Sequence, residues 1–280
     1  MPLDSARTQS PAGENAGARD TAPAFDAGFN ISLSPSSLGF DYGPGVFGPE
    51  VECRRLKDIR ASLLDPQCDG PDPVYGIAMD VGRSEDRADL ERRMLLYGAV
   101  VYAAGQLGEE PVRSQGHVHK IAPHSGWPPP ELFEIWEGRA IVYAQEFAAD
   151  DPGRCAAVIA EPGDLVVVPP GWAHAVINAD PRRRMAFGAW CDRQYGFVYD
   201  AVRARGGLAH FPRLAGERIE WAANPRYRPR PLWPRRARSY PELGLRAGVP
   251  IYRQYLEDAG SVEWIARPAD YAALWPKFEP

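Results

Sequence analysis

The sequence predicts an all-β protein with many short strands, and composition and strand pattern both indicate this class. Gly and Pro number 27 and 29 among 280 residues, a combined share above the roughly 12% of average proteins, which disfavours long helices. The strand candidates are short apolar runs bounded by Gly or Pro, a pattern typical of β-sandwiches and barrels. They cover residues 74–81, 95–103, 132–145, 156–160, 165–168, 173–178 and 185–190.

Short helical segments are expected only beside these strands. Leu56, Ile59 and Leu63 recur at i, i+3 and i+7, which predicts a packing helix over residues 54–64. The charged run over residues 84–93 is expected to form a solvated loop or a helical turn. We assign no function to either segment.

Composition divides the chain into three parts. Residues 1–30 are small and polar, with too few apolar side chains to offset the entropy of ordering, and are predicted to be a disordered leader. Residues 31–215 hold the strands and would form one β domain with an N-terminal flank. Residues 216–280 form the third part. Six arginines are interleaved with prolines over residues 226–238, and this segment is expected to be an extended surface strap. An aromatic segment after Val249 is expected to pack on the core or on a second subunit.

Charge and apolar runs exclude several classes of protein. The formal net charge of -5 argues against a nucleic-acid partner. No stretch approaches the ~20 apolar residues of a membrane span, and the first 20 residues lack the apolar core of a secretory signal. The four cysteines show no C-x-x-C spacing, which disfavours a disulfide framework or a zinc ribbon. We therefore expect a cytoplasmic protein without a membrane partner.

Three of the five histidines lie in two motifs with the spacing of metal ligands. On a strand, residues i and i+2 share a face, so His117 and His119 point the same way. Residues 163–178 form the pattern of a turn, a buried strand, a Pro-Pro-Gly corner and a second strand that carries His174. Between the two motifs, ELFEIWEG begins at Glu131. Three imidazoles and one carboxylate suit Fe, Mn, Zn or Ni.

Strand alternation separates the side chains of the ELFEIWEG segment. Glu131 shares one face with Phe133 and Ile135, whereas Glu134 shares the other with Leu132 and Trp136. The two glutamates therefore cannot both point inward. One of the two, Glu131 or Glu134, is therefore expected to supply the carboxylate ligand. Leu132 and Trp136 are expected to pack on the outer face.

The two motifs resemble the paired motifs of the cupin superfamily. The second fits G-x5-P-x-G-x2-H-x3-N at every fixed position, and the first fits H-x-H followed by E-x6-G. This resemblance implies a double-stranded β-helix, or jelly roll, with short flanking helices and extensions at both termini. The chain differs in residues 120–130, an insertion that predicts a longer loop at the barrel mouth.

Within the cupins, the chain resembles the archaeal-type, cupin-type phosphoglucose isomerases. The resemblance is carried by LLYGAVVYAAGQLGEEPVRSQGHVH at residues 95–119, by QYG at residues 194–196 and by GPEVECRRLKDIR at residues 48–60, and it covers residues 45–215. It implies a jelly-roll homodimer that binds one metal ion per chain and admits a sugar phosphate to the barrel. It also implies a place in glycolysis and gluconeogenesis.

The same resemblance implies roles for individual residues. One divalent metal ion would be bound by the set His117, His119, Glu131 and His174. Ser114, which stands where the family has a Thr, and the Gly116 N–H would bind the phosphate. Tyr195 would line the sugar site, and Glu131 and Tyr195 would be catalytic. His124, His210 and Cys191 are expected to have no direct role, and Asn178 to be either a hydrogen-bonding partner of the site or a turn residue.

Three positions depart from the family pattern. Phe133 replaces a Tyr, Arg193-Gln194 stands where the family has a His, and Trp190 aligns with a second Tyr. These changes weaken the expectation that the substrate is glucose 6-phosphate, but they do not affect the metal site.

The leading functional expectation is a metal-dependent sugar-phosphate isomerase that interconverts an aldose and a ketose. The metal would polarise the C1 and C2 oxygens, and Glu131 would shuttle the proton through a cis-enediol, with a hydride shift as the competing mechanism. Two alternatives stay open. One is a cupin oxygenase or lyase that acts on a small acid, and the other is a sugar-binding cupin without catalysis.

Overall fold

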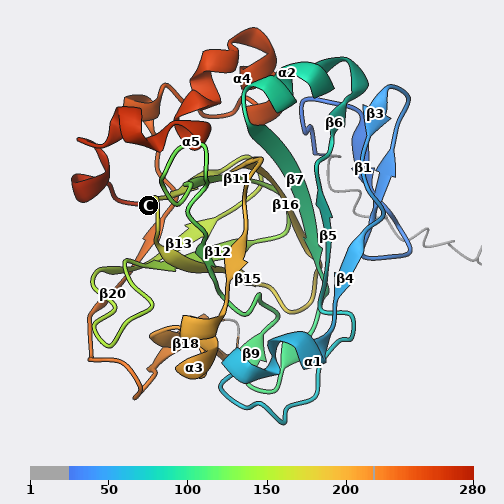
Figure 1. The fold of residues 1–280 in the computed structure, drawn as a ribbon. Coiled ribbons are helices and arrows are strands. Elements are labelled where there is room, and N and C mark those ends of the chain that lie inside the picture. Colours follow the sequence, from blue (N-terminus) through green and yellow to red (C-terminus); the bar gives the residue numbers. More distant parts are fainter. Residues whose placement is uncertain (1–24, 217) are drawn as a thin grey trace, which may run out of the picture.

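The fold consists of two β-sheets that face each other around a shared apolar core (Figure 1). It is described by a computed structural model over residues 25–216 and 218–280. The larger sheet has six strands in the order β14-β11-β16-β7-β5-β4, and the smaller has four in the order β15-β12-β13-β20. The predicted all-β class with short flanking helices is confirmed.

The elements of the fold have the following bounds. The larger sheet contains β4 (Glu52–Arg54), β5 (Tyr75–Met79), β7 (Leu95–Tyr102), β11 (Glu131–Glu137), β14 (Leu165–Val168) and β16 (Met185–Asp192), and the smaller contains β12 (Ala140–Gln145), β13 (Cys155–Ala160), β15 (Ala173–Asn178) and β20 (Leu232–Arg236). Two-stranded pairs are β1 (Ile31–Leu33) with β2 (Phe40–Tyr42), β3 (Val46–Phe47) with β6 (Gly82–Arg83), β8 (Gln106–Leu107) with β9 (Glu110–Pro111), β10 (Val118–His119) with β17 (Phe197–Val198), and β18 (His210–Ala215) with β19 (Arg218–Ala223). The α-helices are α1 (Leu56–Ile59), α2 (Arg87–Arg92), α3 (Asp200–Ala204), α4 (Ile251–Glu257) and α5 (Glu263–Ala266).

The predicted strands are present, with one difference at residues 132–145. This segment was expected to be a single strand, but the chain turns at Gly138 and passes from β11 in the larger sheet to β12 in the smaller. Gly138 has a φ of +78°, and a Cβ there would lie 2.7 Å from the Arg184 carbonyl oxygen. The turn therefore requires glycine, and it is the point at which the chain crosses between the sheets.

The predicted helix over residues 54–64 is shorter than its apolar spacing indicated. Helix α1 ends at Ile59, a 3-10 turn covers Arg60–Ser62, and the backbone is extended at Leu63. Leu56, Ile59 and Leu63 are nevertheless all buried in the core between the sheets. The charged run over residues 84–93 takes the helical alternative, because it contains α2.

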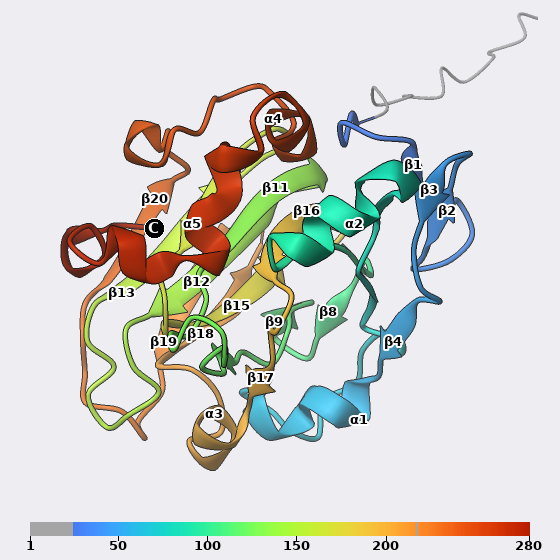
Figure 2. The ribbon, with the colours of Figure 1, turned by 45° about the horizontal axis from the view of Figure 1, so that its top comes forward.

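The two faces of β11 enter different parts of the core, as alternation predicts. Phe133 and Ile135 lie in the cluster between the sheets, whereas Leu132 and Trp136 lie in the cluster on the outer face of the larger sheet. Helices α4 and α5 cover that outer face (Figure 2). Both faces of β11 are therefore removed from water.

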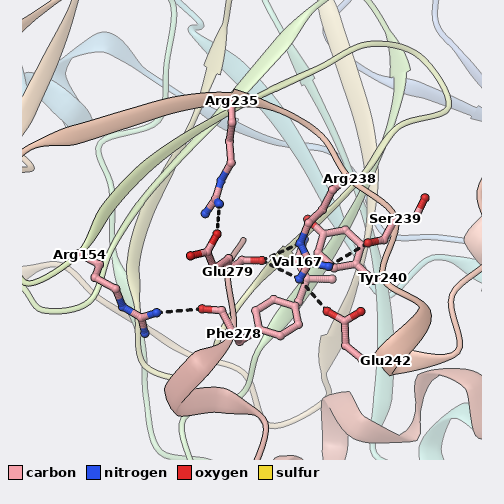
Figure 3. A network of polar contacts seen from close by, with 9 residues as sticks. All are labelled: Arg154, Val167, Arg235, Arg238, Ser239, Tyr240, Glu242, Phe278 and Glu279. Atoms are coloured by element: carbon pink, nitrogen blue, oxygen red, sulfur yellow. Dashed lines mark hydrogen bonds and ion pairs between the residues drawn. The ribbon is translucent and has the colours of Figure 1, made fainter.

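The Arg-Pro segment, predicted to be an extended surface strap, contributes the edge strand β20, which pairs in parallel with β13. Its arginines also contact the C-terminal residues (Figure 3). Arg238 lies over the rings of Tyr240 and Phe278 and donates to the Glu279 carbonyl at 2.8 Å, and Arg235 forms an ion pair with Glu279. The segment thus joins the end of the chain to the smaller sheet.

The predicted leader is described only at its last residues, because residues 1–24 lie outside the described part of the chain. Phe25 stacks on Trp136 with ring centroids 4.7 Å apart, and Ala27 is buried in the outer cluster. Residues 25–30 therefore pack on the sheet. Among the described helices, none has the length and apolar character needed to cross a membrane.

Candidate metal centre

Two predicted ligands face each other across a single β-bridge. The His117 N–H donates to the His174 carbonyl at 3.0 Å, and the His174 N–H donates to the His117 carbonyl at 2.9 Å. This pairing brings together motifs that are 57 residues apart in sequence. The two imidazole rings lie with their centroids 4.3 Å apart.

The remaining two predicted ligands complete the group. Glu131 begins β11, and its Oε2 lies 3.1 Å from Nε2 of His174 and 3.3 Å from Nε2 of His119. The candidate ligand atoms of the four residues all lie within 4.8 Å of one another. The structure therefore brings together His117, His119, Glu131 and His174 as one cage that can hold one metal ion.

The outer nitrogens of two imidazoles are occupied by backbone carbonyls. Nδ1 of His119 donates to the Pro129 carbonyl at 2.9 Å, and Nδ1 of His174 donates to the Trp172 carbonyl at 3.0 Å. These bonds leave each Nε2 unprotonated and directed at the cage, the arrangement found in metal-binding histidines. Because Pro129 belongs to the insertion over residues 120–130, that loop helps to orient a ligand.

The inner nitrogens supply a direct test of whether the cage suits a metal. Nε2 of His117 and Nε2 of His119 are buried without a hydrogen-bond partner in the described structure, and the approach of His119 to Glu131 lacks hydrogen-bond geometry. Buried polar atoms without a partner are rare in proteins. A metal ion bound between these atoms would satisfy both, so the residues present fit a metal.

The electrostatics of the cage favour the ligand forms of His117 and Glu131. Burial, with the neighbouring His174 and His119, holds the pKa of His117 well below its usual value. Burial alone would raise the pKa of Glu131, but the adjacent imidazoles of His119 and His174 hold it well below the usual range. A neutral imidazole and an ionised carboxylate are the states that coordinate metals.

Glu134, the alternative ligand, does not reach the cage. Its Oε2 accepts the Ile251 backbone N–H at 3.3 Å and the Trp136 indole N–H at 3.4 Å on the outer face of the sheet. Burial raises the pKa of Glu134 to about 8. The alternation of β11 therefore separates the two glutamates, as predicted.

A cavity of about 60 Å³ lies beside the cage, between the sheets. Ser114 and Gly116, the predicted phosphate-binding residues, both line it. The Ser114 hydroxyl accepts the Val176 N–H at 3.1 Å. Gly116 has a φ of +87°, and a Cβ there would lie 2.8 Å from Leu208. Glycine is thus required at a position where the backbone borders the cavity.

Tyr195 lies next to a residue of the cavity wall. It packs against Phe197 with ring centroids 5.3 Å apart and is not among the residues that line the cavity. Phe197 and Tyr199 line the cavity instead, and the Phe197 ring lies 4.3 Å from that of His117. Neither residue was predicted, although aromatic residues at 195, 197 and 199 alternate with the period of a strand, a signal that could have indicated them.

The residues expected to have no direct role differ in their surroundings. His124 Nε2 lies 2.6 Å from Asp192 Oδ2, which ties the insertion to the end of β16, and His210 contacts the Tyr143 hydroxyl of β12. The Asn178 amide donates to the carbonyls of Ala103 and Arg183, the bonding of a turn residue. Cys191 differs from expectation, because its thiol donates to Glu131 Oε1 at 3.2 Å and so contacts a ligand.

Comparison with known proteins identifies the family. The model of the glucose-6-phosphate isomerase (GPI) family matches residues 54–228, more than half of the chain. The chain belongs to this family. The predicted resemblance to the cupin-type phosphoglucose isomerases is thereby confirmed, and the two facing sheets agree with the predicted cupin jelly roll.

Relatives within the GPI family are distant in sequence but span most of the β domain. Glucose-6-phosphate isomerase of Thermococcus onnurineus is 25% identical over 203 residues, which cover 70% of this chain and 97% of the relative. That of Pyrococcus horikoshii is 27% identical over 150 residues, which cover 51% of this chain and 72% of the relative. Vicilin of Corylus avellana aligns at 12% identity with a TM-score of 0.36, covering 56% of this chain and 37% of that chain, a likeness too weak to support an argument.

Proposed function

We propose that the protein is a metal-dependent isomerase that interconverts the aldose and ketose forms of a sugar phosphate, with glucose 6-phosphate and fructose 6-phosphate as the first pair to test. The observation that carries this proposal is the cage of three imidazoles and one carboxylate beside the cavity, in a chain of the GPI family. The relatives named above are glucose-6-phosphate isomerases.

The cage residues would hold one divalent ion, Fe, Mn, Zn or Ni. When bound, such an ion acts as a Lewis acid toward the C1 and C2 oxygens of the sugar. His117, His119 and His174 would act as fixed neutral ligands. Ser114 and the Gly116 N–H would orient the phosphate end, and Phe197 would exclude water from the side of the cage that it covers.

Glu131 is the group best placed to move a proton between C2 and C1. Its carboxylate is buried, ionised and within 3.3 Å of two imidazoles, so its position is fixed. Proton transfer by a positioned side chain contributes typically 10² to 10⁴ in rate. Exchange of the C2 hydrogen with solvent deuterium during turnover tests this role, and turnover without exchange would support a hydride shift instead. Tyr195, which packs on Phe197, would act on the edge of the site.

One observation favours a second candidate, a cupin oxygenase or lyase that acts on a smaller acid. The cavity of about 60 Å³ is lined by apolar side chains such as Phe133, Phe187 and Val100, whereas pockets for small molecules usually measure ~300 Å³ or more. Oxygen uptake by the Fe(II)-loaded protein in the presence of small acids, without turnover of sugar phosphates, would favour this candidate.

The deciding experiment combines metal analysis with a substrate screen. We expect the purified protein to contain close to one equivalent of metal and to isomerise at least one hexose or pentose phosphate. His174→Ala should lose both properties, while His210→Ala, a matched change outside the cage, should keep both. Stoichiometric metal in the His174→Ala variant would contradict the cage.

We further propose, from the family resemblance, that the protein is a cytoplasmic homodimer that works in glycolysis and gluconeogenesis. We also propose that residues 31–215 form the cupin domain and that residues 216–280 form an extension packed on it. Light scattering coupled to size-exclusion chromatography measures the oligomeric state directly. A monomeric mass for the active protein would contradict the dimer.

A further inference from the structure

Two arginines beside the cavity have no part in the function proposed above. Arg54 ends β4, where it pairs in register with Tyr75, and Arg203 in α3 lies over the ring of Tyr199; both aromatic residues line the cavity. We propose that Arg54 and Arg203, called here the arginine pair, form an anion site that binds the phosphate group of the substrate. This inference rests on the proposed function, because it names how a sugar phosphate would be recognised.

Arg203 is linked directly to the residues that border the cavity. Its Nε donates to the Gln115 side-chain oxygen at 2.9 Å, and Gln115 is buried between Ser114 and Gly116, the expected phosphate-binding residues. The guanidinium carbon lies 4.9 Å from the centre of the Tyr199 ring. Arg203 therefore stands at the edge of the same wall that would receive the phosphate.

Arg54 lies just before α1, a helix that contacts Arg203. The 3.4 Å bond from Arg203 to the Asp58 carbonyl joins α3 to α1, just after β4, and the two helices lie at the same end of the fold in Figures 1 and 2. Arg54 is the register partner of Tyr75, which lines the cavity, and its Nε is buried without a hydrogen-bond partner among the described residues. It thus retains an unsatisfied donor.

The ion pair of Arg54 is of a kind that an anionic ligand can displace. Arg54 lies 3.0 Å from Glu52, whose side chain is 66% exposed, and exposed ion pairs contribute little stability. A phosphate accepts bidentate, charge-assisted hydrogen bonds from guanidinium groups, which are stronger. Arg54 and Arg203 carry two positive charges, whereas Glu52 carries one negative charge. The group therefore has an excess of positive charge that an anion can neutralise.

The positive charges of Arg54 and Arg203 both affect the Tyr199 phenol. Burial raises the pKa of the Tyr199 phenol, and the charges of Arg54 and Arg203 oppose that rise. Both guanidinium groups therefore lie within electrostatic range of one side chain on the cavity wall. This supplies the cationic groups that Ser114 and Gly116 lack, in a chain with few lysines near the site.

Steady-state kinetics with the sugar phosphate that the protein turns over tests whether the arginine pair binds the phosphate. We expect Arg54→Gln and Arg203→Gln each to raise KM about ten- to a hundredfold with a much smaller change in kcat, since each removes a charge-assisted hydrogen bond. Arg203→Lys should recover part of the loss. Glu52→Gln should act in the opposite direction and lower KM two- to threefold, as roughly expected for an exposed competing charge.

The matched control is Arg205→Gln, two residues along the chain from Arg203 and just after the end of α3. Arg205 pairs with Asp150 at 2.7 Å and lies over the Tyr227 ring, neither of which lines the cavity. We expect its KM to equal that of the wild type. Wild-type KM in both Arg54→Gln and Arg203→Gln would overturn the anion site while leaving the proposed isomerase intact.

Calorimetric titration with inorganic phosphate gives a readout that needs no turnover. We expect the wild type to bind phosphate about tenfold more tightly than Arg54→Gln or Arg203→Gln, with Arg205→Gln unchanged. If no sugar phosphate is turned over but this difference holds, the anion site stands and the proposed function fails. Equal binding in all variants, or none by the wild type, overturns the anion site.

Discussion

Glu131 and Glu134 occupy the same strand, are almost equally buried and yet have opposite electrostatic behaviour. Glu131 is 7% exposed and faces the space between the sheets, where His119 and His174 hold its pKa well below the usual range. Glu134 is 4% exposed and faces the C-terminal helices, where burial raises its pKa to about 8. One carboxyl is ionised at neutral pH, and the other is largely protonated.

The difference shows that burial alone does not make a functional carboxylate. Desolvation acts on both groups in the same direction, but only Glu131 has imidazole partners. Glu134 has two long hydrogen bonds, from a backbone N–H and an indole N–H. The partners on each face of β11, and not the depth of burial, decide which carboxyl remains charged.

The largest expected effect is on catalysis. Glu131→Gln should lower kcat of the proposed isomerase about 10²- to 10⁴-fold, because it removes the proton-transferring group. Glu134→Gln should leave kcat within about twofold, because Glu134 does not face the cavity. Equal losses in both variants, measured with the same sugar phosphate, would break the functional distinction between the two faces.

The next effect is on the pH dependence of stability. Folded Glu134 keeps its proton up to about pH 8, whereas the unfolded chain releases it near the usual value of 4.5. The free energy of unfolding should therefore fall as pH rises from about 5 to 8, then level off. At about 1.4 kcal/mol for each pH unit, this loss is on the order of 3–4 kcal/mol.

Urea denaturation across this pH range tests the expectation. Glu134→Gln should remove the fall and be more stable than the wild type at pH 9, with equal stability near pH 5. Glu137→Gln, on the same strand but half exposed and paired with Arg184, should keep the wild-type slope. An unchanged slope in Glu134→Gln would show that Glu134 is ionised in the folded protein.

Removal of metal should change Tm differently in variants on the two faces of β11. A ligand present at 100 times its Kd stabilises the native state by about 2.7 kcal/mol, which corresponds to a rise in Tm of roughly 5–10 °C for a domain of this size. Chelator should therefore lower Tm of the wild type and of Glu134→Gln by that amount. Glu131→Gln should start with a lower Tm and respond little, and a full response would exclude Glu131 as a ligand.

The smallest expected effect concerns the thiol that contacts Glu131. Cys191→Ala removes the hydrogen bond to Oε1 at 3.2 Å and should weaken metal binding about threefold, in keeping with the loss of one weak donor. Cys191→Ser should restore most of the affinity. Competition with a chromophoric chelator measures both values, and identical affinities for the Ala variant and the wild type would make Cys191 a packing residue only.

Features that depend on local spacing could be predicted from the sequence. The i, i+2 spacing of His117 and His119 and the alternation of Glu131 with Phe133 define faces of strands. Because these rules act over a few residues, they predict the all-β class and most strands, and the motifs shared with the family add the four cage residues. The left-handed turn at Gly138 was not predicted, because the apolar run continues through it.

Features that depend on contacts between distant segments could not be predicted in this way. The pairing of His117 with His174, the cover of Glu134 by the N-terminus of α4 and the convergence of Arg54 and Arg203 on Tyr199 each join segments more than 50 residues apart. No local pattern encodes such contacts, because packing of whole sheets and helices sets them. For the same reason the sequence did not indicate that Phe197 and Tyr199 line the cavity.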